Sequence, residues 1–132
     1  MPWCVSTRTI ALINMSNKKV VEAYMEAFHE HDHARILACL TDDVTWDMPG
    51  FFHHEGKEAF DKEIENDAFT GKPNITTTRM IEEGNIVVAE GAVTAQMKNG
   101  GILDAVFCDV FEFEGDKIQK LTSYLMQRKK TN

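Results

Sequence analysis

One carboxylate stands in the middle of the most apolar strand-like segment of this chain. Residues 102–113 read ILDAVFCDVFEF, and with a period of two Asp109 shares a face with Phe107 and Phe111. The charged form of a carboxyl group is costly among such neighbours unless it is paired or protonated. Two interpretations follow: a structural aspartate satisfied by backbone or water, and a site carboxyl with a raised pKa that lines an apolar pocket.

Other residue patterns that carry chemistry are missing from the sequence. The run His29-Glu30-His31-Asp32-His33 has the composition of a metal site, but a spacing of two turns successive side chains to different sides of a helix. We therefore predict a solvated helix end there and no metal site. The sequence contains no glycine-rich phosphate loop and no serine or cysteine in a nucleophile elbow, so no cofactor is expected.

Length, charge and cysteine usage narrow the class of protein. The 132 residues suffice for one domain with a real core. A net charge of -7 disfavours nucleic acid and anionic membranes as partners, and no apolar run approaches the length of a membrane span. Cys4, Cys39 and Cys108 are odd in number and widely spaced, which favours a reducing compartment over a disulfide framework. Without a signal-peptide pattern, a cytoplasmic location is expected.

The chain is predicted to divide into three parts. Residues 1–14 are expected to be an extension, because Ser16 or Asn17 can cap the helix that follows. A single domain is expected over residues 15–127, and residues 128–132 are expected to form a basic tail.

Hydrophobic periodicity predicts helices in the first half of the domain and strands in the second. The predicted helices cover residues 18–30, a short segment from Asp32, and residues 56–66. A turn is predicted at residues 41–43. The predicted strands cover residues 44–48, 74–82, 86–97, 102–113 and 118–127. This order indicates an α+β domain with helices on one side of a curved antiparallel sheet.

The turn between the predicted strands 86–97 and 102–113 decides which residue of the first strand lies opposite Asp109. If Asn99-Gly100 is a two-residue turn, Glu90 lies opposite Asp109 and Thr94 shares their face. Glu90 would then add to the desolvation that raises the pKa of Asp109.

The turn between the predicted strands 102–113 and 118–127 decides which residue of the last strand lies opposite Asp109. A turn around Gly115-Asp116 puts Thr122 across from Asp109 and Tyr124 across from Phe107. The predicted inner face therefore gathers polar groups among aromatic side chains. A sealed core is not built in this way, whereas a ligand cavity is.

The order of elements, with TDDVTWDMPG at the first strand and DVFEFEGDKI at the last hairpin, resembles the nuclear transport factor 2-like superfamily. The most similar branch is that of the SnoaL-like polyketide cyclases and ketosteroid isomerases, over about residues 15–127. The resemblance implies a cystatin-like cone, in which three helices wrap a curved antiparallel sheet around an apolar pocket. It also implies a homodimer formed through the sheet, and Val87, Val93, Val106 and Val110 are expected on the outer face.

The ketosteroid isomerase pattern transfers at two positions and fails at a third. AYMEAF resembles the helix with the oxyanion-hole tyrosine and implies that role for Tyr24, although core packing would also explain a tyrosine there. CDVFEF resembles the strand with the neutral aspartic acid of the same hole and implies that role for Asp109. In VTWDMPG, Met48 stands where that family has its general-base aspartate, and Asp47 is expected to face away from the pocket.

Histidines after the first strand could replace the missing base. His53 and His54 would lie at the mouth of the cone, and imidazole titrates near neutral pH; an exposed loop is the alternative for each. The expected catalytic residues are Tyr24, Asp109, His53 and His54. The expected ligand-binding residues are Phe28, Trp46, Met48, Phe52, Phe60, Glu90, Thr94, Phe107, Phe111, Thr122 and Tyr124.

The sequence leaves more than one function open. The first is a small-molecule-binding domain that acts as a cofactor-independent isomerase, cyclase or dehydratase on an apolar, oxygenated ligand, with Tyr24 and Asp109 polarising a carbonyl. The second is a non-catalytic ligand-binding domain, in which the lost base reflects lost chemistry. The third is a protein-interaction domain of the same fold.

Overall fold

A computed structural model describes residues 16–128, so the predicted extension over residues 1–14 and all but the first residue of the predicted tail lie outside it. The described helices are α2 (Asn17–His29), α3 (His33–Ala38) and α4 (Lys57–Ile64). The described strands are β1 (Leu40–Met48), β2 (Phe52–Glu55), β3 (Phe69–Glu83), β4 (Ile86–Met97), β5 (Ile102–Glu114) and β6 (Lys117–Gln127). None of these helices is long and apolar enough to cross a membrane.

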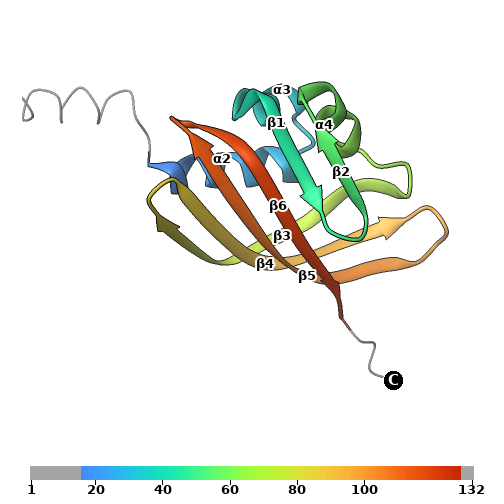
Figure 1. Cartoon of the computed structure of the whole chain (residues 1–132). Coiled ribbons are helices and arrows are strands. Elements are labelled where there is room, and N and C mark those ends of the chain that lie inside the picture. Colours follow the sequence, from blue (N-terminus) through green and yellow to red (C-terminus); the bar gives the residue numbers. More distant parts are fainter. Residues whose placement is uncertain (1–15, 129–132) are drawn as a thin grey trace, which may run out of the picture.

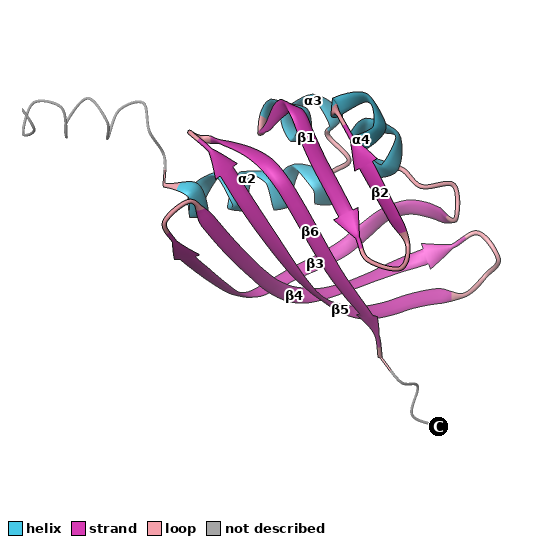
Figure 2. Cartoon of the chain, viewed as in Figure 1, coloured by secondary structure: helices cyan, strands magenta, loops and turns pink. Residues whose placement is uncertain are grey.

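The strands form one curved sheet in the order β2-β1-β6-β5-β4-β3. All neighbours are antiparallel except β1 and β6, which run parallel. Helix α2 packs against β3 and β4, and α4 packs against β1 and β2 (Figures 1 and 2). The predicted α+β architecture, with helices against a curved antiparallel sheet, is confirmed.

Helices α2 and α3 begin at side-chain caps that the sequence carries. Ser16 Oγ accepts a hydrogen bond from the Lys19 backbone N–H at 3.3 Å, and this confirms one of the two predicted caps of α2. Asp32 Oδ1 accepts from the Arg35 backbone N–H at 3.2 Å and starts α3. These local bonds fix the start of each helix without help from the sheet.

The first half of the sheet differs from the prediction. Strand β1 begins at Leu40, so the turn expected at residues 41–43 is wrong. Leu40 pairs in parallel with Ile118 of β6, and the Ile118 N–H donates to the Cys39 carbonyl at 2.8 Å. Strand β2 was not expected. The start of β1 depends on pairing with β6, which is distant in sequence, whereas β2 forms by pairing with β1 across the turn at residues 49–51. Periodicity reports neither pairing.

The register between β4 and β5 is one residue away from the predicted one. Gln96, not Met97, pairs with Ile102, so Ala89 rather than Glu90 lies opposite Asp109. The reversal is longer than two residues, because the Met97 N–H donates to the Gly101 carbonyl at 2.9 Å. A one-residue shift turns every side chain of β4 to the other face of the sheet.

The shift corrects the prediction for four residues of β4. Glu90 and Thr94 lie on the outer face, where Arg79 Nε donates to Glu90 Oε1 at 2.8 Å. Val87, expected outside, is fully buried in the core, and Val93, also expected outside, lines the interior cavity. The inner face of β4 is therefore apolar.

An irregularity moves the register between β5 and β6 as well. Phe113 pairs with Ile118, but the ladder shifts between Glu112 and Phe113, and Asp109 faces Ser123. Thr122 was expected across from Asp109 and Tyr124 across from Phe107. Both instead lie on the outer face, because the register is again shifted by one residue. The Tyr124 side chain is 53% exposed there.

Gly91 marks a point where β3, β4 and a side chain of β5 approach closely. A Cβ atom at this position would lie 2.1 Å from the Thr76 carbonyl oxygen and 2.7 Å from the Phe107 ring. Because backbone must move to relieve the first contact, we expect Gly91→Ala to lower the free energy of unfolding by about 1–3 kcal/mol or more. Urea unfolding measures this.

Gly101→Ala is the matched control for the substitution at Gly91. Its Cβ would meet only the end of the Asn99 side chain, at 3.2 Å. We expect a change within about 0.5 kcal/mol. Equal effects of the two substitutions would contradict the close approach at Gly91.

Candidate functional site

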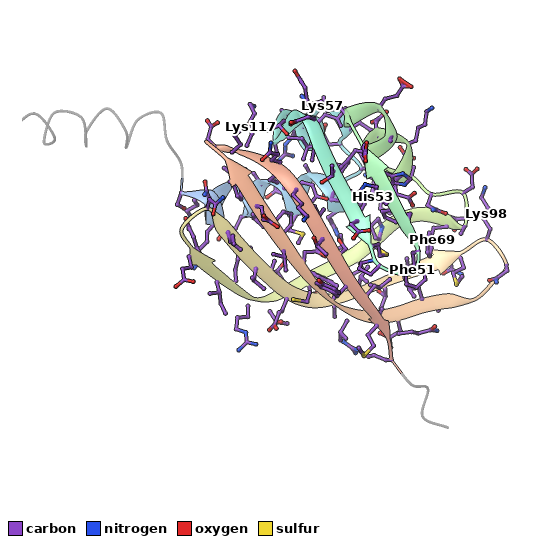
Figure 3. The ribbon with its side chains drawn as sticks, in the orientation of Figure 1. Phe51, His53, Lys57, Phe69, Lys98 and Lys117 are labelled. Carbon is purple, nitrogen blue, oxygen red and sulfur yellow. The ribbon has the colours of Figure 1, made fainter. Side chains whose placement is uncertain are left out.

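The sheet and the helices enclose a cavity of about 670 Å³. Figure 3 shows Phe51, in the turn between β1 and β2, and Phe69, at the start of β3, at the same end of the molecule, and both line the cavity. The aromatic lining residues are Tyr24, Phe28, Trp46, Phe51, Phe52, Phe69 and Phe107. A space of this size and character holds a drug-sized organic molecule.

Asp109 projects from the middle of β5 into this cavity. Its side chain is half-buried: it keeps some surface toward the cavity, and the rest is packed among protein atoms. Burial raises the pKa of Asp109 to about 7, and a hydrogen bond from Ser123 opposes the shift. Glu90 makes no contribution, because it lies on the other face of the sheet. The carboxyl group therefore exists in both protonation states near neutral pH.

A short chain of hydrogen bonds orients the Asp109 carboxyl group. Trp46 Nε1 donates to Ser123 Oγ at 3.0 Å. The Ser123 hydroxyl has one proton, and with its oxygen engaged by Trp46 that proton is left for Asp109. Ser123 is only 4% exposed. Ser123 was not expected at the site, because the irregularity between β5 and β6 brings it, rather than Thr122, to the inner face.

Tyr24 reaches the same cavity from α2. Its ring packs edge-on against Phe111 with centroids 5.3 Å apart, and it is 2% exposed. Burial, with a smaller contribution from the negative charge of Asp109, raises the pKa of Tyr24 well above its ordinary value. The phenol stays protonated and can donate a hydrogen bond. The structure thus brings both residues of the predicted donor pair to one cavity, while their catalytic role stays a prediction.

Met48, which stands where the ketosteroid isomerase pattern has its general base, is also on the cavity wall. Met48 lines the cavity, whereas Asp47 lies on the opposite face of β1, where its Oδ1 is 3.7 Å from His53 Nδ1. The predicted orientation of Asp47 is confirmed. A thioether cannot carry a proton at neutral pH, so this wall offers no base.

Neither histidine that was expected at the cavity mouth lines the cavity. His53 shares the outer face with Asp47 and is hydrogen-bonded to Glu55 at 3.1 Å. His54 faces inward but is covered by the ring of Phe52, which stacks on it with centroids 4.5 Å apart. Alternation along β2 explains why the two differ, and close packing explains why His54 is shielded.

Glu63 lines the cavity, whereas His54, which was expected there, lies behind it as its hydrogen-bond partner. Its Oε1 lies 2.8 Å from His54 Nε2, its Oε2 accepts from Asn66 Nδ2 at 2.6 Å, and it lines the cavity from α4. Periodicity predicts a helix over residues 56–66, but only the tertiary structure pairs Glu63 with His54.

The run of residues 29–33 was predicted to be a solvated helix end, but His33 is bound to two carboxylates of another part of the chain. His33 Nδ1 lies 2.5 Å from Asp61 Oδ1, and its Nε2 contacts Glu65. Hydrogen bonds to these two carboxylates raise the pKa of His33. Within residues 16–128, no group of three or more candidate ligands could hold a metal ion.

The predicted ligand-binding residues divide into three groups. Those that line the cavity are Phe28, Trp46, Met48, Phe52 and Phe107. Phe60 and Phe111 are instead fully buried in the core, so their expected contact with a ligand is wrong. Phe60 stacks behind Trp46, with ring centroids 4.5 Å apart. Those on the outer face of the sheet are Glu90, Thr94, Thr122 and Tyr124.

The raised pKa of Asp109 makes stability depend on pH. The folded protein holds this proton up to about pH 7, whereas an unfolded aspartate releases it near its ordinary value of 3.8. The stabilisation is therefore complete below the ordinary value and is lost as pH rises toward 7. We expect Asp109→Asn, which cannot ionise, to be more stable than the wild type above pH 7, by up to about 4 kcal/mol. Urea unfolding of both proteins at about pH 5 and about pH 8 measures this, and identical pH dependence would contradict it.

Comparisons with known proteins identify the family of this chain and other proteins with the same architecture. The profile of the SnoaL-like domain family matches residues 21–121. No curated protein matches the chain. An NTF2-like protein of unknown function from Burkholderia pseudomallei superposes with a TM-score of 0.77 at 23% identity, over 85% of this chain and 92% of that chain.

Two further solved structures have the same fold. An LEH-like epoxide hydrolase from M. tuberculosis superposes with a TM-score of 0.72 at 20% identity, over 82% of this chain and 80% of that one. TerC, co-crystallised with polyporic acid, superposes with a TM-score of 0.72 at 18% identity, over 85% of this chain and 91% of that one. The predicted nuclear transport factor 2-like fold is confirmed.

Proposed function

This chain belongs to the SnoaL-like domain family, and we propose that it binds a small, apolar, oxygenated molecule in its cavity and transfers a proton on it without a cofactor. The observation that carries the proposal is the pKa of Asp109, raised to about 7 inside an apolar cavity. A group that titrates near the working pH is the most effective general acid or base.

The two polar groups have complementary roles in this proposal. Tyr24 keeps its proton and donates a hydrogen bond to the oxygen of the ligand. Asp109 gives its proton in the acid form and takes one in the carboxylate form, while Ser123 holds it in place. In an apolar site such hydrogen bonds act without competition from water. An isomerase, a cyclase or a dehydratase needs these two functions.

The structural neighbours support a ligand in the cavity. One is named an LEH-like epoxide hydrolase and another was co-crystallised with polyporic acid, so this fold serves small organic molecules in other proteins. A cavity of about 670 Å³ also disfavours a protein-interaction domain with a filled interior. The second candidate is a ligand-binding domain without catalysis, and Met48 at the expected base position favours it.

A thermal-shift screen of polyketides, steroids and terpenoids tests binding. We expect neutral members that fit the cavity to raise the melting temperature of the wild type and of Gln96→Trp, but not of Ala95→Trp. Ala95 lines the cavity and Gln96, its neighbour on β4, faces out, so the two substitutions add the same side chain on opposite faces. Equal shifts in both variants would place the ligand outside the cavity.

We also propose that the protein forms a homodimer through the outer face of the sheet. Val106, Tyr124 and Met126 are 40%, 53% and 70% exposed there, and Val106 pairs with Met126 across the strands. Apolar side chains gathered on one face favour a covering partner. Light scattering is expected to give the mass of two chains for the wild type and of one for Val106→Lys. A wild-type monomer at micromolar concentration would contradict the proposal.

A further inference from the structure

We propose that the cavity selects its ligand by charge: it prefers a molecule with a protonated amine at one end and excludes organic anions, and Glu63 sets this preference. The inference rests on the proposed function, because it concerns the ligand of the same cavity. It adds the chemical class of the ligand, which neither the fold nor the donor pair specifies.

The charged groups around the cavity are almost all acidic. Within the described residues the lining contains no lysine and no arginine, whereas Asp109, Glu63 and Glu65 contribute three carboxyl groups. The one imidazole is His31, whose Nδ1 lies 3.9 Å from Glu65 Oε1. An anionic ligand would therefore meet mainly negative groups, and burying an unpaired anion is costly.

Glu63 is the carboxylate best placed to bind a cation. Its side chain is 17% exposed, and His54 and Asn66 each bind one of its oxygens, so its orientation is fixed. The amide N–H of Asn66 orients the carboxylate without cancelling its charge, and each oxygen keeps a further lone pair for a ligand. Glu65 is less suitable, because it is 57% exposed and already engaged by His33.

The aromatic wall next to Glu63 suits the same ligand. Phe52 stacks on His54, the partner of Glu63, and packs edge-on against Trp46 with ring centroids 5.1 Å apart. Trp46 and Phe52 both line the cavity. The faces of aromatic rings attract an ammonium group, most strongly when water is excluded, and they bind the apolar remainder of an amine equally well.

Three naphthalenes of matched size test the proposal: 2-naphthylmethylamine, 2-naphthylmethanol and 2-naphthoate. Isothermal titration calorimetry at about pH 8, where the amine stays largely protonated and Asp109 is ionised, gives the affinity of each. We expect the amine to bind most tightly, the alcohol less tightly, and the carboxylate at least about tenfold more weakly than the amine.

Glu63→Gln separates the carboxylate from the rest of the cavity. The substitution keeps the shape of the side chain and one acceptor oxygen for Asn66, and its NH2 group can donate to His54 Nε2 in the other imidazole tautomer, so we expect normal folding. The amine is expected to lose most of its advantage over the alcohol, by about tenfold, while the affinity for the alcohol stays unchanged. Glu22→Gln, on the exposed side of α2 beside Lys19, removes the same net charge away from the cavity and is expected to leave the order intact.

The outcomes distinguish this inference from the proposed function. If the alcohol binds but the carboxylate binds as tightly as the amine, charge selection is wrong and the proposed function stands. The same holds if Glu63→Gln and Glu22→Gln change the amine affinity equally, since the effect would then belong to the net charge. If none of the three molecules binds, the cavity is not a ligand site and both proposals fail.

Discussion

Asp109→Asn is expected to slow proton abstraction inside the cavity by about 10²–10⁴-fold, the usual contribution of a positioned general base. The carboxyl group has a pKa near 7 and lines the cavity, while Met48, which also lines it, offers no base. Asparagine keeps the shape of the side chain and loses the ability to take up a proton. The effect should therefore fall on the rate and leave folding intact.

Ring opening of 5-nitrobenzisoxazole measures this effect without knowledge of the natural ligand. A base removes the one proton on the carbon of the isoxazole ring, the N–O bond breaks, and a coloured cyanophenolate forms. The probe is neutral, flat and aromatic, and so suits the cavity. For the wild type the rate is expected to rise with pH through about 7, because only the carboxylate form of Asp109 is a base.

Asp104→Asn provides the control on the same strand. Asp104 lies on the outer face of β5, where its Oδ1 is 3.7 Å from Arg128 Nη1, and it is expected to have no effect on the rate. A perturbed carboxyl group titrates between about pH 5 and 9. A wild-type rate that does not change with pH over this range would contradict the role of Asp109. So would equal rates in the wild type and Asp109→Asn.

Met48→Asp is expected to raise ketosteroid isomerase activity, which is expected to be feeble in the wild type. Tyr24 and Asp109 are both at the cavity, and Met48 lines it where the resembling ketosteroid isomerases have their base. A β,γ-unsaturated 3-ketosteroid becomes conjugated when a base moves a proton from one carbon to another, and the absorbance of the product reports the reaction. We expect a gain of about 10²–10⁴-fold over the wild type.

Met48→Asn is the matched control, because it introduces the polarity and size of the new side chain without a base. If Met48→Asp folds, binds the steroid and stays inert, Tyr24 and Asp109 do not form a working donor pair. If the wild type isomerises the steroid well, another residue supplies the base, and the importance assigned to Met48 is wrong. Binding of the steroid to each variant is measured first, so that a missing reaction is not confused with an empty cavity.

The sequence by itself determined most of the elements, β2 and the first residues of β1 excepted, and the inward direction of several key side chains. Alternation along residues 102–113 placed Asp109 between Phe107 and Phe111, and the structure has it on that inner face. Helical spacing put Tyr24 on the buried side of α2. Alternation also separated Asp47 from Met48. These features depend only on the local period of a helix or a strand, which the order of residues carries directly.

Only the tertiary structure decided which neighbours these side chains meet. The longer reversal at Met97–Gly101 and the irregularity after Glu112 each move the register of a strand, and a shift of one residue exchanges the two faces. Ser123 therefore replaces Thr122 beside Asp109. In the same way, Glu63 enters the cavity paired with His54 because α4 packs on β2, a contact that no local period encodes.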